Sequence, residues 1–135
     1  YAKELGIEDY VTFTGRVPDQ GMLEMLNTAD VCVNPDIANE MNDKSTMNKI
    51  MEYMALGKPV VQFELTEGRF SAQEASLYAI KNDEQDMARK IVELLDNKER
   101  RDVMGEYGRR RVEEMLAWDQ DAPTHLRAYA ALFGC

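Results

Sequence analysis

Hydrophobic and polar positions along the chain follow two alternating periods. Short apolar or β-branched runs, typical of strands in a parallel sheet covered on both faces, occur at Val11–Thr14, Val31–Val33, Pro59–Phe63 and Leu77–Ile80. Apolar residues at helical spacing predict helices that start at Pro18 or Asp19, cover Ser45–Leu56, start at Asn82 or Asp83, and cover Lys98–Leu116 and Trp118–Phe133. This alternation predicts βαβ units and therefore an α/β fold with a doubly wound parallel sheet.

Ligands in such sheets bind beyond the carboxyl ends of the strands. The loops expected at that edge are Gly15–Val17, Asn34–Lys44 and Glu64–Ser76. The second of them leads into the helix predicted from Ser45, which would end at Gly57 and continue into a buried strand. This helix is therefore the first candidate to carry the binding residues.

The predicted Ser45–Leu56 helix carries one apolar face and one polar face. At about 100° per residue, Ser45, Lys49 and Glu52 fall close together on the side opposite the methionines. The free backbone N–H groups and the hydroxyls of Ser45 and Thr46 can hold a phosphate, Lys49 can neutralise its charge, and Glu52 can accept ribose hydroxyls. This combination suits a phosphorylated, hydroxyl-bearing ligand such as a nucleotide sugar.

Each of these residues also has a plain structural interpretation. Ser45 is an ordinary helix cap, as is Asp43, and Lys49 and Glu52 form a surface pair at i, i+3 spacing. Arg16 follows a glycine that ends a strand, so it either points into the cleft or is a plain surface arginine.

Composition excludes several classes of function. The net charge of −9 disfavours a nucleic-acid partner. No apolar stretch is long enough to span a membrane, and no signal peptide is visible. A single histidine, His125, argues against a metal site, so no metal is expected. Cys32 in a strand and Cys135 at the end of the chain fit a reducing cytoplasm.

Three blocks of the sequence resemble a known family. They read V-T-F-T-G-R-V-P, A-D-V-C-V-N-P and N-K-I-M-E-Y-M-A-L-G-K-P-V-V. Their order and spacing resemble the C-terminal domain of retaining GT-B glycosyltransferases of the group 1, or family 4, class. A closing stretch with W-D and Y-A-A-L-F looks like the family's last helix, here 118–133. The resemblance covers nearly the whole chain and implies a Rossmann-like domain that binds a nucleotide-sugar donor.

The resemblance also implies roles for individual residues. Glu52 matches the glutamate that holds the ribose, and Lys49 matches a lysine found in a subset of the family. Arg16 and Val17 lie where the base is contacted, and Ser45 and Thr46 lie where backbone amides meet the diphosphate or the donor sugar.

One position departs from the family pattern. The family often has a second glutamate eight positions before the ribose glutamate, where this chain has Lys44. Glu40 and Asp43 are the candidates to replace it.

The resemblance further implies that residues 1–135 are one incomplete domain whose first two strands precede Tyr1. The strand at Val11–Thr14 would then have no neighbour, since those two strands would separate it from Val31–Val33. The catalytic groups would lie mainly in an N-terminal domain. We expect the chain by itself to be marginally stable, inactive, and prone to associate or to pair the Val11–Thr14 strand elsewhere.

The expected activity is transfer of a hexosyl-type sugar from a UDP- or GDP-sugar to a glycan, lipid-linked or small-molecule acceptor, as in polysaccharide biosynthesis. The enzyme would be cytoplasmic and would need no cofactor or metal. Peripheral membrane association of the full-length enzyme is compatible with this expectation. Two alternatives stay open, a GT-B-shaped nucleotide-sugar epimerase and a non-catalytic α/β binding module.

Overall fold

A three-stranded parallel sheet forms the centre of the molecule. The computed structural model describes residues 1–134, and its strands are β1 (Cys32–Asn34), β2 (Val60–Phe63) and β3 (Ser76–Ala79), in the order β1-β2-β3. Cys32 pairs with Val60 and Val60 with Ser76 in the parallel register. The α/β fold with parallel strands is therefore confirmed.

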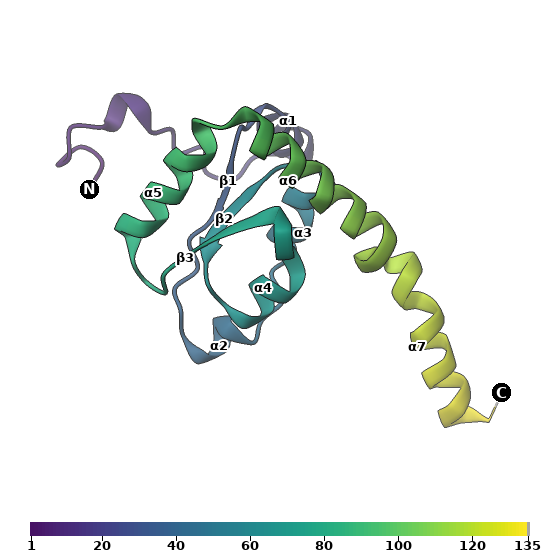
Figure 1. Ribbon diagram of the computed structural model, residues 1–135. Helices are drawn as coiled ribbons and strands as arrows, with labels where there is room; N and C mark the ends of the chain where they lie inside the picture. Colours follow the sequence, from purple (N-terminus) through teal and green to yellow (C-terminus); the bar gives the residue numbers. More distant parts are fainter. Residues whose placement is uncertain (135) are drawn as a thin grey trace.

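Helices cover both faces of this sheet (Figure 1). The α-helices of the described chain are α1 (Asp19–Thr28), α2 (Glu40–Asp43), α3 (Asn48–Ala55), α4 (Thr66–Ala72), α5 (Glu84–Leu95), α6 (Lys98–Arg111) and α7 (Trp118–Phe133), of which α7 projects away from the sheet. Short 3-10 turns lie at η1 (Glu8–Tyr10) and η2 (Gln73–Ala75), and a π-helical segment, η3 (Val112–Leu116), joins α6 to α7.

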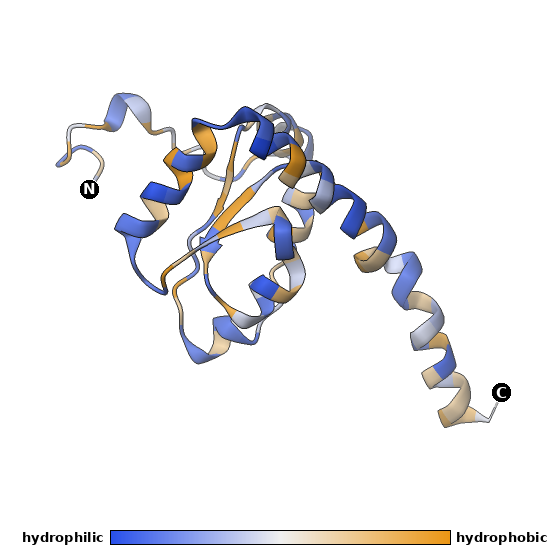
Figure 2. Cartoon of the chain, in the orientation of Figure 1, coloured by the Kyte–Doolittle hydropathy of each residue, from blue (hydrophilic) through white to orange (hydrophobic). Residues whose placement is uncertain are grey.

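Alternate residues of each strand point to opposite faces, so the core has two halves. On one face, Val61, Phe63 and Ala79 pack against Met87 and Leu94 of α5, with Met104 of α6. On the other face, Val60 packs with Ile50 and Met54 of α3 and with Ala72 and Ala75. Figure 2 shows the strands as the most hydrophobic elements, with hydrophilic residues along the surrounding helices. This double cover explains why the β2 sequence reads as a continuous apolar run.

The strand predicted at Val11–Thr14 does not form. These residues are extended but unpaired, and Phe13 is 83% exposed. An isolated strand has no ladder hydrogen bonds to stabilise it, so β propensity alone does not make one. The lack of a neighbouring strand, expected from the family resemblance, gives the physical reason.

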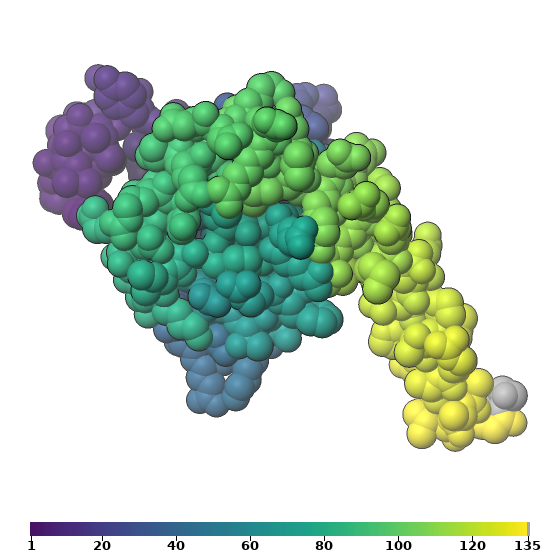
Figure 3. Space-filling view, in the orientation of Figure 1, coloured from purple at the N-terminus to yellow at the C-terminus, as the bar shows by residue number. Residues whose placement is uncertain are grey.

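Three further boundaries differ from prediction. The segment after β1, predicted as a loop from Asn34 to Lys44, contains α2, because the Asn39 side chain caps a short helix there. The segment after β2, predicted as a loop through Ser76, contains α4 and η2. The helix predicted from Ser45 begins only at Asn48. The final helix was correctly predicted, and it extends away from the globular body (Figure 3). Cys32 is buried in β1 as expected, whereas Cys135 lies outside the described residues.

Candidate functional site

The carboxyl ends of the three strands are followed by loops that one carboxylate joins together. Asp43, at the end of α2, accepts hydrogen bonds from the Thr66 backbone N–H at 3.1 Å and from the Thr66 hydroxyl at 2.8 Å. It also accepts one from Lys81 Nζ at 3.1 Å, just beyond β3. These bonds, those from Thr66 first, hold the pKa of Asp43 below its usual value. The loops after β1, β2 and β3 are thereby connected.

A second link joins the first and third loops. Asn82 accepts a hydrogen bond from the Ala38 N–H at 2.6 Å and donates one to the Ala38 carbonyl at 3.2 Å. Asn82 has φ +60°, a conformation that asparagine tolerates better than most residues. Polar side chains, rather than an apolar core, therefore hold together the loops at this edge of the sheet.

Ser45 and Thr46 precede α3 instead of beginning it. The residue before Asn48 is Met47, whose side chain provides no capping hydrogen bond. The Ser45 hydroxyl donates to the Met41 carbonyl at 2.6 Å, and the Thr46 hydroxyl donates to Glu67 Oε2 at 2.9 Å. The expectation of a hydroxyl-capped helix start is wrong, because both hydroxyls are engaged by neighbouring segments. Their contact with a phosphate or a donor sugar remains a prediction.

Glu52 and Lys49 lie on α3, one turn apart, but they do not pair with each other. Lys49 Nζ lies 2.8 Å from Asp36 Oδ2, in the loop after β1. That oxygen has no hydrogen bond of good geometry, so the contact is an ion pair. Glu52 is exposed, and its side chain forms no hydrogen bond or ion pair within residues 1–134. Its carboxylate is therefore available to a ligand.

The last residue of β1 is an unusual polar group. Asn34 is only 1% exposed, and neither its side-chain oxygen nor its nitrogen has a hydrogen-bond partner in the described structure. Burying an amide without partners is costly. Asn34 pairs in register with Gln62, whose Oε1 is likewise buried without a partner. Sequence analysis did not find either residue, since a strand-ending Asn-Pro reads simply as a turn.

The predicted base-contacting residues, Arg16 and Val17, lie in the segment just before α1. Arg16 is exposed and forms no hydrogen bond or ion pair with the rest of the described chain. Val17 is half-buried just before α1. The structure therefore places Lys49 and Glu52 on one helix, and within residues 1–134 no hydrogen bond or ion pair joins Arg16 to either of them.

The cations at this edge are already matched by carboxylates. The pairs are Lys44–Glu40, Lys49–Asp36, Arg69–Glu64 and Lys81–Asp43, with distances of 2.8, 2.8, 2.8 and 3.1 Å. A phosphate that binds here has to compete with a carboxylate for each cation. Among the candidates to replace the glutamate at Lys44, Asp43 is occupied by Thr66 and Lys81, and Glu40 pairs with Lys44 on the surface.

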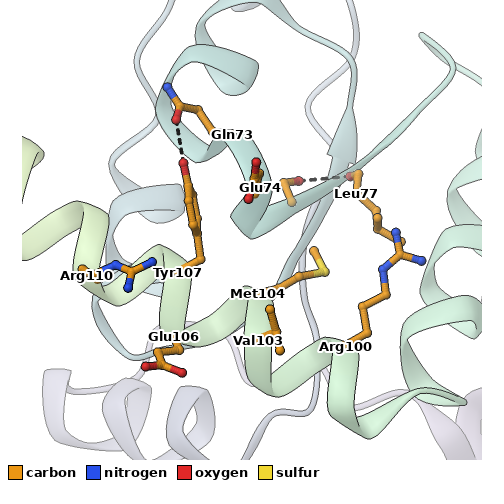
Figure 4. Close-up of a pocket in the computed structure, with 10 residues that line it drawn as sticks. Gln73, Glu74, Leu77, Arg100, Val103, Met104, Glu106, Tyr107 and Arg110 are labelled. Carbon is orange, nitrogen blue, oxygen red and sulfur yellow. Dashed lines mark hydrogen bonds between the residues drawn. The ribbon is translucent and has the colours of Figure 1, made fainter.

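Two hollows of different volume lie at opposite ends of the strands. One of about 320 Å³ lies beside α3 and α4 and includes Thr46. A larger one, about 580 Å³, lies between β3 and α6, where Tyr107 donates a hydrogen bond to Gln73 at 2.7 Å (Figure 4). Since Gln73 precedes β3, this cavity is at the amino end, opposite the edge where such sheets bind ligands.

Two features are absent from the described part of the chain, a metal-binding cluster and a membrane-spanning helix. Residues 1–134 contain no group of three or more histidines, cysteines and carboxylates that could hold a metal ion. No helix among them is long and apolar enough to cross a membrane.

Comparison with known protein families identifies the family of this chain. A profile described as "Glycosyl transferases group 1" matches residues 1–97. The chain belongs to the group 1 glycosyltransferases. No curated protein matches this glycosyltransferase sequence significantly.

The fold of this group 1 glycosyltransferase matches a solved structure. Sucrose-phosphate synthase from Thermosynechococcus elongatus superposes with a TM-score of 0.80 and 24% sequence identity. The match covers 98% of this chain and 33% of the synthase, so the chain spans about a third of that protein's length. The domain is therefore similar in fold to part of a GT-B glycosyltransferase, and the expected family is confirmed.

Proposed function

We propose that this chain is the donor-binding part of a retaining glycosyltransferase, which transfers a sugar from a UDP- or GDP-sugar to an acceptor hydroxyl in the cytoplasm. The observation that carries the proposal is the free carboxylate of Glu52. The neighbouring carboxylates Asp36, Asp43 and Glu67 are each engaged by a cation or a hydroxyl, whereas Glu52 is exposed on α3 without a partner in the described chain.

Glu52 suits a pair of ribose hydroxyls. An ionised carboxylate accepts two hydrogen bonds side by side, and bonds to a charged group are stronger than those between neutral groups. Lys49 lies one turn earlier on the same helix, where its ammonium can exchange Asp36 for a diphosphate oxygen. The catalytic groups are proposed to come mainly from an N-terminal domain of the full-length protein.

Substitution of Glu52 tests this assignment. Glu52→Gln keeps the size of the side chain but removes its charge, so we expect the dissociation constants of UDP and GDP to rise about 10- to 100-fold. Isothermal titration calorimetry on the full-length protein measures this change. Glu106→Gln is the matched control, since Glu106 is also exposed and lies beside the cavity at the other end of β3. Equal affinity in Glu52→Gln and wild type would refute the site.

The reaction itself needs a separate test. With a nucleotide-sugar and an acceptor, the full-length protein is expected to release the nucleoside diphosphate and to keep the anomeric configuration of the sugar. Proton NMR of the first product, before mutarotation, reads that configuration. An inverted anomer would exclude the retaining mechanism, and an isomerised nucleotide-sugar without transfer would exclude a transferase.

We also propose that donor binding needs no metal ion. The charge of the diphosphate would be balanced by Lys49 and by cationic side chains of the full-length protein. Removal of divalent ions with EDTA is therefore expected to change the UDP or GDP dissociation constant by less than about twofold, within RT ln 2. A loss of binding that Mg²⁺ or Mn²⁺ restores would contradict this proposal.

A further inference from the structure

A hollow of about 320 Å³ lies where α3, α4, η3 and the first turns of α7 meet. We call it the α3–α4–α7 hollow, and its polar lining consists of Thr46, Asn48, Glu67, Ser71 and Asp121. Its volume is at the lower end of the roughly 300–1,000 Å³ found for small-molecule pockets. It adjoins the candidate donor site through Thr46, and α7 takes part in it although sequence analysis gave that helix only a structural role.

The charge of the hollow selects against phosphate. Two carboxylates, Glu67 and Asp121, line it, and no lysine or arginine does. Glu67 accepts a hydrogen bond from the Thr46 hydroxyl at 2.9 Å, which leaves its other oxygen available. The Asp121 side chain forms no hydrogen bond or ion pair within residues 1–134. An anion placed between these carboxylates is repelled, whereas hydroxyl groups can donate to both.

An exposed aromatic ring lies at the same hollow. Phe70 of α4 is 63% exposed, and Arg111 fixes its backbone by donating to the Phe70 carbonyl and to the Ser71 carbonyl, each at 2.8 Å. The Arg111 guanidinium also lies 5.9 Å from the centre of the ring. The face of the Phe70 ring that Arg111 does not cover can pack against the weakly positive C–H groups of a ligand.

A sugar ring combines the two kinds of group that this lining requires. Its hydroxyls match the carboxylates and the Asn48 amide, and its C–H face matches the Phe70 ring. The apolar remainder of the hollow, Met51 and Leu116, accommodates the carbon skeleton. A nucleoside diphosphate lacks this fit because its charge opposes that of Glu67 and Asp121.

We propose that the α3–α4–α7 hollow binds a neutral sugar unit. The inference rests on the proposed function and deepens it, because it assigns a sugar subsite beyond the nucleotide-contacting face of α3. Two sources can supply the sugar, an acceptor glycan and the sugar of the donor. Both present the same chemistry of hydroxyls and C–H face, so the experiment has to distinguish them.

The test uses ligand-detected NMR with the full-length protein and three probes. Maltose is the neutral probe, glucose 6-phosphate the anionic one and spermidine the cationic one. We expect maltose to bind, and neither charged probe to displace it at equal concentration. No detectable binding of maltose would overturn the inference, as would displacement by glucose 6-phosphate or spermidine.

Variants locate the binding. Phe70→Ala and Asp121→Asn are expected to raise the maltose dissociation constant about 5- to 10-fold, by loss of the ring contact and of a charged acceptor. The matched controls are Phe13→Ala, another exposed ring, and Asp119→Asn, two residues earlier on α7 and outside the lining. Equal maltose affinity in Phe70→Ala, Asp121→Asn and wild type would place the sugar elsewhere and overturn the inference.

The source of the sugar follows from competition. An acceptor subsite predicts that maltose still binds when UDP-glucose is saturating and that Phe70→Ala raises the acceptor KM. A donor subsite predicts that UDP-glucose excludes maltose and that the donor KM rises; either result supports the neutral-sugar assignment. If UDP and GDP bind independently of Glu52 while maltose binding needs Phe70, the proposed function fails and the sugar site stands.

Discussion

At the scale of single residues, Asp43 connects more of the candidate site than any residue of α3 does. Its carboxylate accepts from the N-terminal backbone N–H of α4, from the Thr66 hydroxyl and from Lys81. It therefore replaces a local cap for α4, since Leu65, the residue before that helix, makes no side-chain capping bond. The next residue, Lys44, instead forms an ion pair with Glu40 on the surface.

The lowered pKa of Asp43 predicts acid sensitivity. Its folded-state pKa lies below the unfolded-state value of about 3.9, so within that window the unfolded chain binds more protons. The stabilisation is fully present above the unfolded-state pKa and is lost as the pH falls through the folded-state pKa. We expect the urea midpoint of wild type to drop below about pH 4 more steeply than that of Asp43→Asn.

A control variant separates the effect of Asp43 from that of the many other carboxylates that titrate in the same pH range. Asp119→Asn removes a carboxylate that forms no hydrogen bond or ion pair in the described chain, and should keep the steep wild-type dependence. Parallel pH profiles for wild type and Asp43→Asn would show that the Thr66 and Lys81 contacts contribute nothing to stability.

The sequence placed Lys49 and Glu52 on one helix face and named Asp43 as a cap or a substitute glutamate, but it did not predict the contacts of Asp43 with Thr66 and Lys81. The difference is one of range. The positions of Lys49 and Glu52 follow from helical spacing within α3, a local property. The partners of Asp43 lie 23 and 38 residues further along the chain, so no local pattern signals them. Lys49 also shows this limit, because its partner proved to be Asp36 rather than Glu52.

At the scale of elements, α6 approaches the end of α3 unusually closely. A Cβ at Gly105 would lie 2.1 Å from the Gly57 carbonyl oxygen and 2.9 Å from the carbonyl carbon. Both atoms belong to backbone and cannot rotate away. Gly57 has φ +67° and ends the turn after α3, so its own position is fixed by a left-handed conformation that suits glycine.

Gly105→Ala is therefore expected to destabilise the protein by about 1–3 kcal/mol, since α6 must move away from α3. Gly21→Ala makes the same chemical change in α1, where the nearest atom would be 3.9 Å away, and should stabilise by up to about 1 kcal/mol. Urea unfolding of both variants measures the two effects. A Gly105→Ala midpoint equal to or above that of Gly21→Ala would contradict the close approach.

The alternation of strands and long helices followed from the sequence, but α2 and α4 were not predicted, and element boundaries depended on tertiary contacts. The β2 strand was recognisable from its unbroken apolar run. The start of α3 was placed too early because Ser45 bonds back to Met41 and Thr46 across to Glu67. Residues 11–14 also depend on tertiary contacts. Their sequence has strand propensity, but without a partner strand they form no strand.

At the scale of the whole molecule, the buried core is confined to the middle of the chain. None of residues 1–31 is buried, and α7 contains no buried residue. Large apolar side chains are exposed at both ends, among them Tyr10, Phe13, Leu126 and Leu132. β1 is also an edge of the sheet, with an unpaired side beyond Cys32–Asn34. These surfaces favour association, and the net charge of −9 opposes it.

Salt shifts this balance in a predictable direction. The Debye length falls from about 30 Å at 0.01 M salt to about 3 Å at 1 M, so the repulsion between like-charged molecules is screened while apolar attraction is not. We therefore expect the isolated 135-residue chain to sediment mainly as a monomer at 0.01 M NaCl and to associate at 1 M. A monomer at both salt concentrations, measured by sedimentation velocity, would contradict the prediction.

Charge placed on α7 identifies the surface that associates. Leu126 and Leu132 lie on its apolar side, whereas Thr124 and Ala131 fall on the other side at about 100° per residue. The double variant Leu126→Glu, Leu132→Glu should stay monomeric at 1 M NaCl, where added charge is screened but the apolar surface is gone. Thr124→Glu, Ala131→Glu adds equal charge and should still associate. If both variants associate equally, the contact lies at the β1 edge or the N-terminal segment and not on α7.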